Sequence, residues 1–178
     1  MFIDFNQIAR LGKLIALLGF LLPWVTVSCS GNVILEATGL QLMTGDPQPA
    51  GMLEGADRSQ MDDPEPAIGV ILACLAAALG LGLSFVLKGK QAAGAILAGA
   101  LLTIGFSYYS LESLRTEMTR EASEQEDDMA RAVANAIRIE KQEGFWVTVG
   151  GAGVGGVLAL IVLVGAGGVR RPEEATPS

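Results

Sequence analysis

Four long stretches without a charged residue constrain this chain more than any other feature. The sequence has 178 residues, with 12 basic and 19 acidic ones, and all of these charges lie outside the four stretches. The charge-free stretches cover residues 14–35, 66–87, 91–111 and 144–169. A transmembrane helix needs about 20 apolar residues to cross the hydrocarbon core. The sequence therefore predicts an all-α membrane protein, a four-transmembrane-helix up-down bundle.

The four spans are expected to form a single integral membrane domain. The first is the weakest, because its apolar run ends at Val27 and reaches full length only if the helix begins near Ile8. Arg10 and Lys13 would then extend their charged ends to the cytoplasmic surface. The predicted helices cover residues 8–28, 67–87, 91–110 and 145–169.

The charges between the spans predict the orientation of the chain. Residues 29–65 contain seven acidic residues and one basic one, and residues 110–143 contain nine and five. Basic residues prevail near the N-terminus and in the Lys88-Gly89-Lys90 link. Because basic residues flank spans on the cytoplasmic side, the pattern predicts that both termini, including the tail 170–178, lie on the cytoplasmic side of the plasma membrane. The two acidic loops would be extracytoplasmic.

A rival interpretation makes residues 1–29 a lipoprotein signal with Cys29 as the lipidated residue, which leaves three spans. Thr26 stands where such signals usually carry leucine, and this favours the four-span interpretation. Aromatic residues that settle at the headgroup level provide a second guide to the outer ends of the spans. The predicted anchors are Trp24, Tyr108, Tyr109 and Trp146.

The first outer loop, residues 29–66, carries a β-hairpin signal. Two β-prone runs, residues 25–30 and 33–37, flank the dipeptide Gly31-Asn32. This pattern is typical of two strands joined by a tight turn. A short apolar turn at residues 38–45 and a proline-rich acidic loop are expected to follow.

The second outer loop, residues 110–143, is predicted to form an extramembrane helical hairpin. No glycine or proline interrupts residues 106–143, and apolar residues recur at helical spacing on both sides of a turn near residues 122–125. The two apolar stripes either pack on each other or face a partner protein. The partner-facing candidates are Leu114, Met118, Met129, Val133 and Ile137.

Small residues four apart on three of the spans predict close helix packing. Such faces let two helix backbones approach closely in lipid, within one chain or between neighbouring subunits. The predicted packing residues are Gly69, Ala73, Ala77, Gly94, Ala98, Gly151, Gly155 and Ala159.

Several function classes are disfavoured. The chain has no histidine, which removes the commonest general base and metal ligand, and its net charge of -7 disfavours nucleic-acid binding. Residues 151–156 match GxGxxG, but they continue into apolar membrane sequence and lack the βαβ unit of a dinucleotide site. Cys29 and Cys74 are expected to be free thiols, with an intermolecular disulfide through Cys29 as the alternative. No catalytic, cofactor or metal site is predicted, because the acidic clusters lack the spacing of a calcium-binding loop.

Residues 23–29 (PWVTVSC) and 39–45 (GLQLMTG) resemble the first-loop pattern of small, uncharacterised bacterial four-span membrane proteins. The architecture is also similar to that of claudin-like tetraspans, which place a tryptophan and a β-rich segment after the first span. This chain has one cysteine in that loop rather than a pair, so the loop disulfide and a junctional role do not carry over. The resemblance implies a bacterial four-span protein and no particular activity.

The expected function is that of a non-enzymatic accessory, scaffold or assembly subunit. Its partners would be other integral membrane proteins or copies of itself, with membrane lipids around them. The alternative is a binder or carrier of a lipid or quinone-like apolar molecule between the helices.

Overall fold

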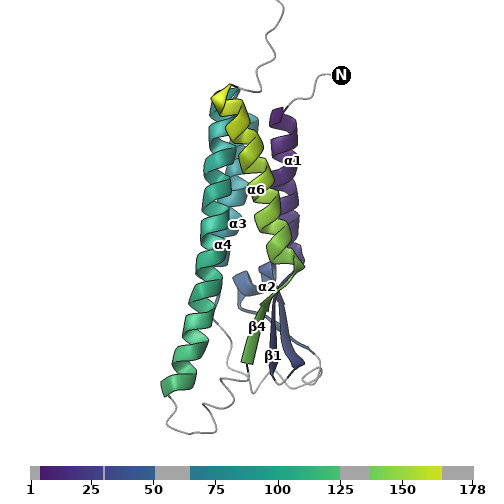
Figure 1. Cartoon of the computed structure of the whole chain (residues 1–178), viewed down its shortest axis with the longest axis vertical. Coiled ribbons are helices and arrows are strands. Elements are labelled where there is room, and N and C mark those ends of the chain that lie inside the picture. Colours follow the sequence, from purple (N-terminus) through teal and green to yellow (C-terminus); the bar gives the residue numbers. More distant parts are fainter. Residues whose placement is uncertain (1–4, 30, 51–64, 125–136, 166–178) are drawn as a thin grey trace, which may run out of the picture.

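A bundle of helices with a small sheet at one end makes up the computed structural model, which describes residues 5–29, 31–50, 65–124 and 137–165 (Figure 1). Most of the described chain is helical. The four long helices lie side by side and are α1 (Phe5–Leu18), α3 (Ile68–Val86), α4 (Lys90–Glu124) and α6 (Glu143–Val164).

Among the described residues, three helices are long and apolar enough to cross a membrane: α3, residues 90–116 of α4, and α6. The predicted third span is therefore the first part of a longer helix, which continues beyond the charge-free stretch (Figure 1). Helix α6 ends earlier than predicted, at Gly165, whose φ of 84° is readily adopted only by glycine. Residues 166–178 lie outside the described part of the chain.

The first predicted span, residues 8–28, is wrong as a continuous helix. Helix α1 has only 14 residues, and a short 3-10 turn, η1 (Gly19–Leu21), follows it. Pro23 then begins strand β1 (Pro23–Cys29). Proline disrupts a helix interior, and the β-branched run Val25-Thr26-Val27 favours extended backbone. The apolar stretch is thus shared between a helix and a strand.

The helical bundle has small residues inside and large apolar residues outside. Alanines such as Ala16, Ala77 and Ala152 are fully buried, whereas Leu79, Leu101 and Val157 are each about 60% exposed. In water this would leave a large apolar surface exposed. In lipid it is favourable, because helices associate there through close contact between small residues. The arrangement indicates a multi-pass membrane protein.

The β-hairpin prediction is confirmed. Strand β1 pairs antiparallel with β2 (Asn32–Thr38), and Cys29 is opposite Asn32. The connection therefore lies at residues 30–31, one position earlier than predicted, and Gly31 adopts a φ of 85° there. In the described part of the chain the sheet has the order β3-β2-β1-β4, with β3 formed by Gln48–Pro49.

The helical hairpin predicted for residues 110–143 is wrong at its C-terminal end. Ile137 begins strand β4 (Ile137–Lys141), which pairs antiparallel with β1. The sequence Ile-Arg-Ile-Glu-Lys alternates in hydrophobicity, and Ile139 packs against the apolar core. The prediction of a helix rests on the spacing of apolar residues alone, and pairing with β1 outweighs that local preference. Met129, Val133 and the side chain of Met118 lie outside what the structure describes.

The segment predicted as an apolar turn forms a short helix, α2 (Gly39–Thr44). Thr38 caps it: its side chain accepts from Gln41 N at 3.2 Å, and its own N–H donates to Gln41 Oε1 at 2.8 Å. The helix is tied to the bundle where Ala67 N donates to Leu42 O at 2.8 Å. It thus supports the start of α3.

Replacing Thr38 with alanine is expected to lower the free energy of unfolding by about 1 kcal/mol, because it removes this cap. Chemical denaturation of the purified protein would measure the change. Substitution of the exposed Thr44, at the other end of α2, is the matched control. Equal effects of the two substitutions would contradict the capping role.

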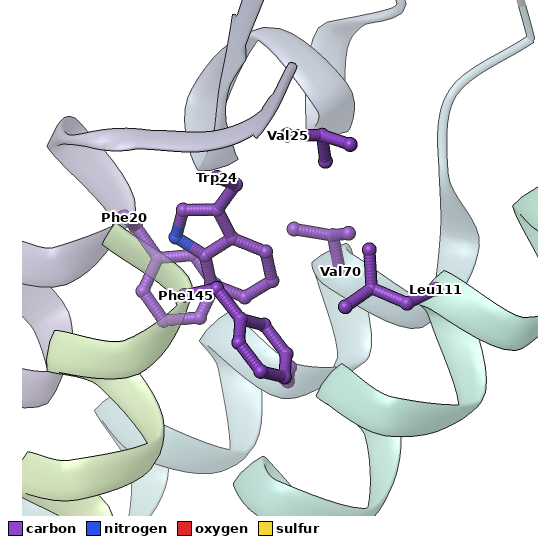
Figure 2. Packing of buried hydrophobic residues seen from close by; sticks show 7 residues of the cluster. Phe20, Trp24, Val25, Val70, Leu111 and Phe145 are labelled. Carbon is purple, nitrogen blue, oxygen red and sulfur yellow. The ribbon is translucent and has the colours of Figure 1, made fainter. Parts of the chain in front are cut away.

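A cluster of aromatic and aliphatic side chains joins the sheet to the bundle (Figure 2). Trp24 from β1 lies at its centre, with Phe20 on one side at 4.7 Å and Phe145 of α6 at 5.8 Å between ring centroids. The indole Nε1 donates to Gly19 O at 2.9 Å. Trp24 is 0% exposed, so its predicted role as a headgroup anchor is wrong, and it is a core residue.

Candidate functional site

Helix α1 packs on α6 through glycine and alanine, where the backbones approach closely. A Cβ on Gly12 would lie 2.9 Å from Gly151 O, and one on Gly155 would lie 3.0 Å from Ala9 O. Ala159 is buried in the same interface, in a cluster with Ala9. Three of the predicted packing residues, on α6, thus contact α1 within one chain and do not form an outward face.

Helices α3 and α4 approach closely where Gly80 meets Gly99. A Cβ on Gly99 would lie 2.9 Å from Ala76 O and 2.9 Å from the Cα of Gly80. Nearer the sheet, a Cβ on Gly69 would lie 2.7 Å from the Cβ of Ser110. The predicted residues Ala73 and Ala77 are both buried in α3. This face of α3 is therefore used within the chain.

The predicted packing residues Gly94 and Ala98 do not pack closely against any helix that the structure describes. A Cβ on Gly94 would meet no atom of the described residues within 4 Å, and Ala98 is exposed. The internal contact uses Gly99 instead, five positions after Gly94 and on another side of the helix. Gly105 also has open space around its Cβ position, and Leu101 is 64% exposed. We call Gly94, Ala98, Leu101 and Gly105 the outer α4 face.

Lys13 is the most unusual side chain of the bundle. The sequence predicted that it would extend to the surface, but it is 0% exposed. Its Nζ reaches the crossing of α3 and α4, 3.1 Å from the position of a Cβ on Gly99 and 3.6 Å from that on Gly80. Within the described residues Nζ has no hydrogen-bond partner. The absence of side chains at the two glycines makes room for this amine.

Arg10 lies one turn before Lys13 and reaches the C-terminal end of α3. Its Nη2 donates to Ser84 O at 2.5 Å, and its guanidinium lies 4.8 Å from the centroid of the Phe85 ring. A cation near the C-terminus of a helix interacts favourably with the helix dipole. In the part of the chain that the structure describes, its buried Nε has no partner. Arg10 and Lys13 therefore leave unused N–H donors on one side of α1.

Buried hydroxyl groups connect the helices along the bundle. Thr103 Oγ1 contacts Gly99 O at 2.6 Å and Ala73 O at 3.4 Å, and Thr148 Oγ1 donates to Ala16 O at 3.2 Å. Ser107 Oγ is buried and, among described residues, has no partner. Most of these hydroxyl groups donate hydrogen bonds to backbone carbonyls, as expected for hydroxyl side chains inside membrane helices.

The remaining predicted residues lie near the sheet. Tyr108, Tyr109 and Trp146 are exposed, which is compatible with the predicted headgroup position, and Lys141 Nζ lies 4.8 Å from the Tyr108 ring centroid. Leu114 is half-buried on α4, where that helix runs past the bundle. Ile137 is in β4, so it does not belong to a helical partner-facing stripe.

Cys74 and the glycine-rich motif both lie within helices of the bundle. Cys74 is a free, half-buried thiol within α3. Residues 151–156 are continuous helix within α6, so they form no phosphate-binding loop. Across the described ranges no group of three or more potential ligands from His, Cys, Asp and Glu could hold a metal ion.

No known protein family, curated protein or solved structure matches this chain. The resemblance of residues 23–29 and 39–45 to bacterial four-span proteins stays a prediction. The outer α4 face and the buried cations of α1 are the features of the described structure that bear on function.

Proposed function

We propose that the chain is a non-enzymatic accessory or assembly subunit of the bacterial inner membrane, which packs laterally against another membrane protein or a second copy. In this proposal α1 and η1 cross the membrane with α3, α4 and α6. At about 1.5 Å per residue for α1 and about 2 Å for η1, the two together extend about 27 Å, close to the thickness of the hydrocarbon core. The sheet lies on the extracytoplasmic side, because the basic residues that mark the cytoplasmic side, Arg10, Lys88 and Lys90, lie towards the opposite end of the bundle (Figure 1).

The outer α4 face is the observation that carries this proposal. Glycine inside a helix costs about 1 kcal/mol relative to alanine. The contact with Gly80 explains the glycine at position 99. At Gly94 and Gly105, no described residue comes close enough to require a glycine. Gly94 and Ala98 are four apart, the spacing at which a second helix can approach closely in lipid. A helix from a neighbouring subunit would account for these residues.

Replacing both Gly94 and Gly105 with leucine is expected to leave the fold intact, because both positions have open space. The same change is expected to abolish the lateral complex, since two large side chains would separate the helix backbones. Native mass measurement on the tagged protein, extracted gently from its own membrane, would detect the loss. It would also show whether the partner is a second copy or another protein.

Gly82→Leu is the matched control, because Gly82 also has open space around its Cβ position but belongs to α3. This variant should keep the complex. A wild-type protein that is always a monomer without bound protein would overturn the proposal. A complex that survives both leucines on α4 would do the same.

A further inference from the structure

The charge of Lys13 has no counter-charge within the described bundle. No acidic residue occurs in α1 or α3. The acidic residues of α4 begin at Glu112, 13 positions after Gly99, and the only one in α6 is Glu143, in its first turn next to the sheet. Burying an ammonium away from water costs several kcal/mol unless an opposite charge or strong acceptors compensate it. Ionisable groups at membrane depth usually belong to a binding site or a pathway for this reason.

The depth of Lys13 matches a site for a membrane amphiphile. Its Nζ is level with Gly80, which lies six residues before Val86 at the end of α3. At 1.5 Å per residue this is about 9 Å from the helix end. Arg10 lies between this point and the helix end, bound to Ser84 O. The two cations therefore lead from the end of the bundle towards its interior.

The contact between α1 and α3 is the route by which a ligand would reach these cations. Helix α1 packs mainly on α6, where small residues let the two backbones approach closely. Its contacts with α3 are made by long side chains such as Arg10 and Lys13. Leu14 of α1 and Leu83 of α3 are each 48% exposed. An acyl chain would thus find exposed apolar surface on both helices.

We propose that Arg10 and Lys13 bind the oxyanion group of a membrane amphiphile, a phosphate or a carboxylate on an apolar tail, between α1 and α3. Lys13 would donate from its ammonium and Arg10 from Nε, the groups that have no partner among the described residues. Gly80 and Gly99 leave the room at this crossing that the ammonium occupies. This inference is independent of the lateral partner proposed for α4.

Lys13→Met tests the proposal, because methionine keeps an unbranched apolar chain but removes the donor. Full-length wild type and variant would be stripped of lipid in neutral detergent. Each would then be titrated with phosphatidylglycerol, oleate, monoolein (a neutral lipid without an oxyanion) or inorganic phosphate while the melting temperature is followed. Phosphatidylglycerol or oleate should stabilise the wild type, and the variant should bind roughly tenfold more weakly. Whichever of the two stabilises more identifies the oxyanion as phosphate or carboxylate.

Lys88→Met is the matched control, since it removes the same charge at an exposed position in the α3–α4 link. It should bind like the wild type. Equal binding by the Lys13 variant would overturn the proposal, as would equal stabilisation by inorganic phosphate, which has no tail. If the Lys13 variant does not fold, the wild type alone decides: equal stabilisation by phosphatidylglycerol, oleate and monoolein would overturn the oxyanion site.

Discussion

Replacing Gly144 with alanine is expected to lower the free energy of unfolding by about 3 kcal/mol, the upper part of the range for overpacking in a closely packed site. Gly144 lies in the first turn of α6, where the chain passes from β4 into the bundle. A Cβ there would lie 2.6 Å from Leu22 O, 2.6 Å from Pro23 O and 2.8 Å from Gly19 O. All three atoms belong to the backbone, so none of them can rotate away.

The free energy of unfolding in mixed detergent micelles would measure this effect. Gly150→Ala is the matched control on the same helix, because a Cβ there meets no atom within 4 Å. We expect that control to be neutral or to stabilise the protein by up to about 1 kcal/mol, the helix propensity difference between the two residues. Similar losses in both variants would contradict the close approach at Gly144.

Replacing Trp24 with alanine is expected to lower the free energy of unfolding by about 3–5 kcal/mol, the range for removing a large aromatic side chain from a core. The loss would separate the sheet from the bundle, because Trp24 packs between Phe20 and Phe145 at this junction (Figure 2). The same unfolding assay would measure the change.

Two further variants separate packing from hydrogen bonding. Trp24→Phe keeps an aromatic ring but removes the donor to Gly19 O. Beyond the lost packing, the loss of this hydrogen bond is expected to lower the free energy of unfolding by about 1 kcal/mol. Trp146→Ala removes the same kind of side chain at a position that is 53% exposed, and it should have little effect. A Trp24→Ala variant as stable as Trp146→Ala would contradict the assigned core role.

Charge-free length and β-branched runs were sufficient to predict three of the long helices and the first hairpin. They failed at the first span, because the run that continues from residue 14 to residue 27 does not show where helix changes to strand. Pro23 was the available signal, and it marks the start of β1. The strand at residues 137–141 was missed for a related reason, since its alternating pattern gains meaning only when β1 is present as a partner.

Small-residue spacing predicted that helices would pack closely but not which face would do so. Gly94 with Ala98 and Ala95 with Gly99 have the same spacing and differ by one position, yet the contact with α3 uses the second pair. The burial of Lys13 could not be predicted from the sequence either. A lysine near the end of an apolar run is ordinarily expected to extend to the surface. Only the position of Gly80 and Gly99 opposite α1 reveals the space that this amine occupies.

We propose that α1 crosses the membrane together with the three longer helices, so that the N-terminal end and the sheet are on opposite sides. Single cysteines at the exposed positions Gln7 and Asn32, in a chain whose own cysteines are replaced by serine, would report on this topology. A membrane-impermeant maleimide would be applied to intact and to permeabilised cells. A four-span chain should be labelled at position 32 in intact cells and at position 7 only after permeabilisation. Labelling of both positions from the same side would rule out a membrane crossing by α1.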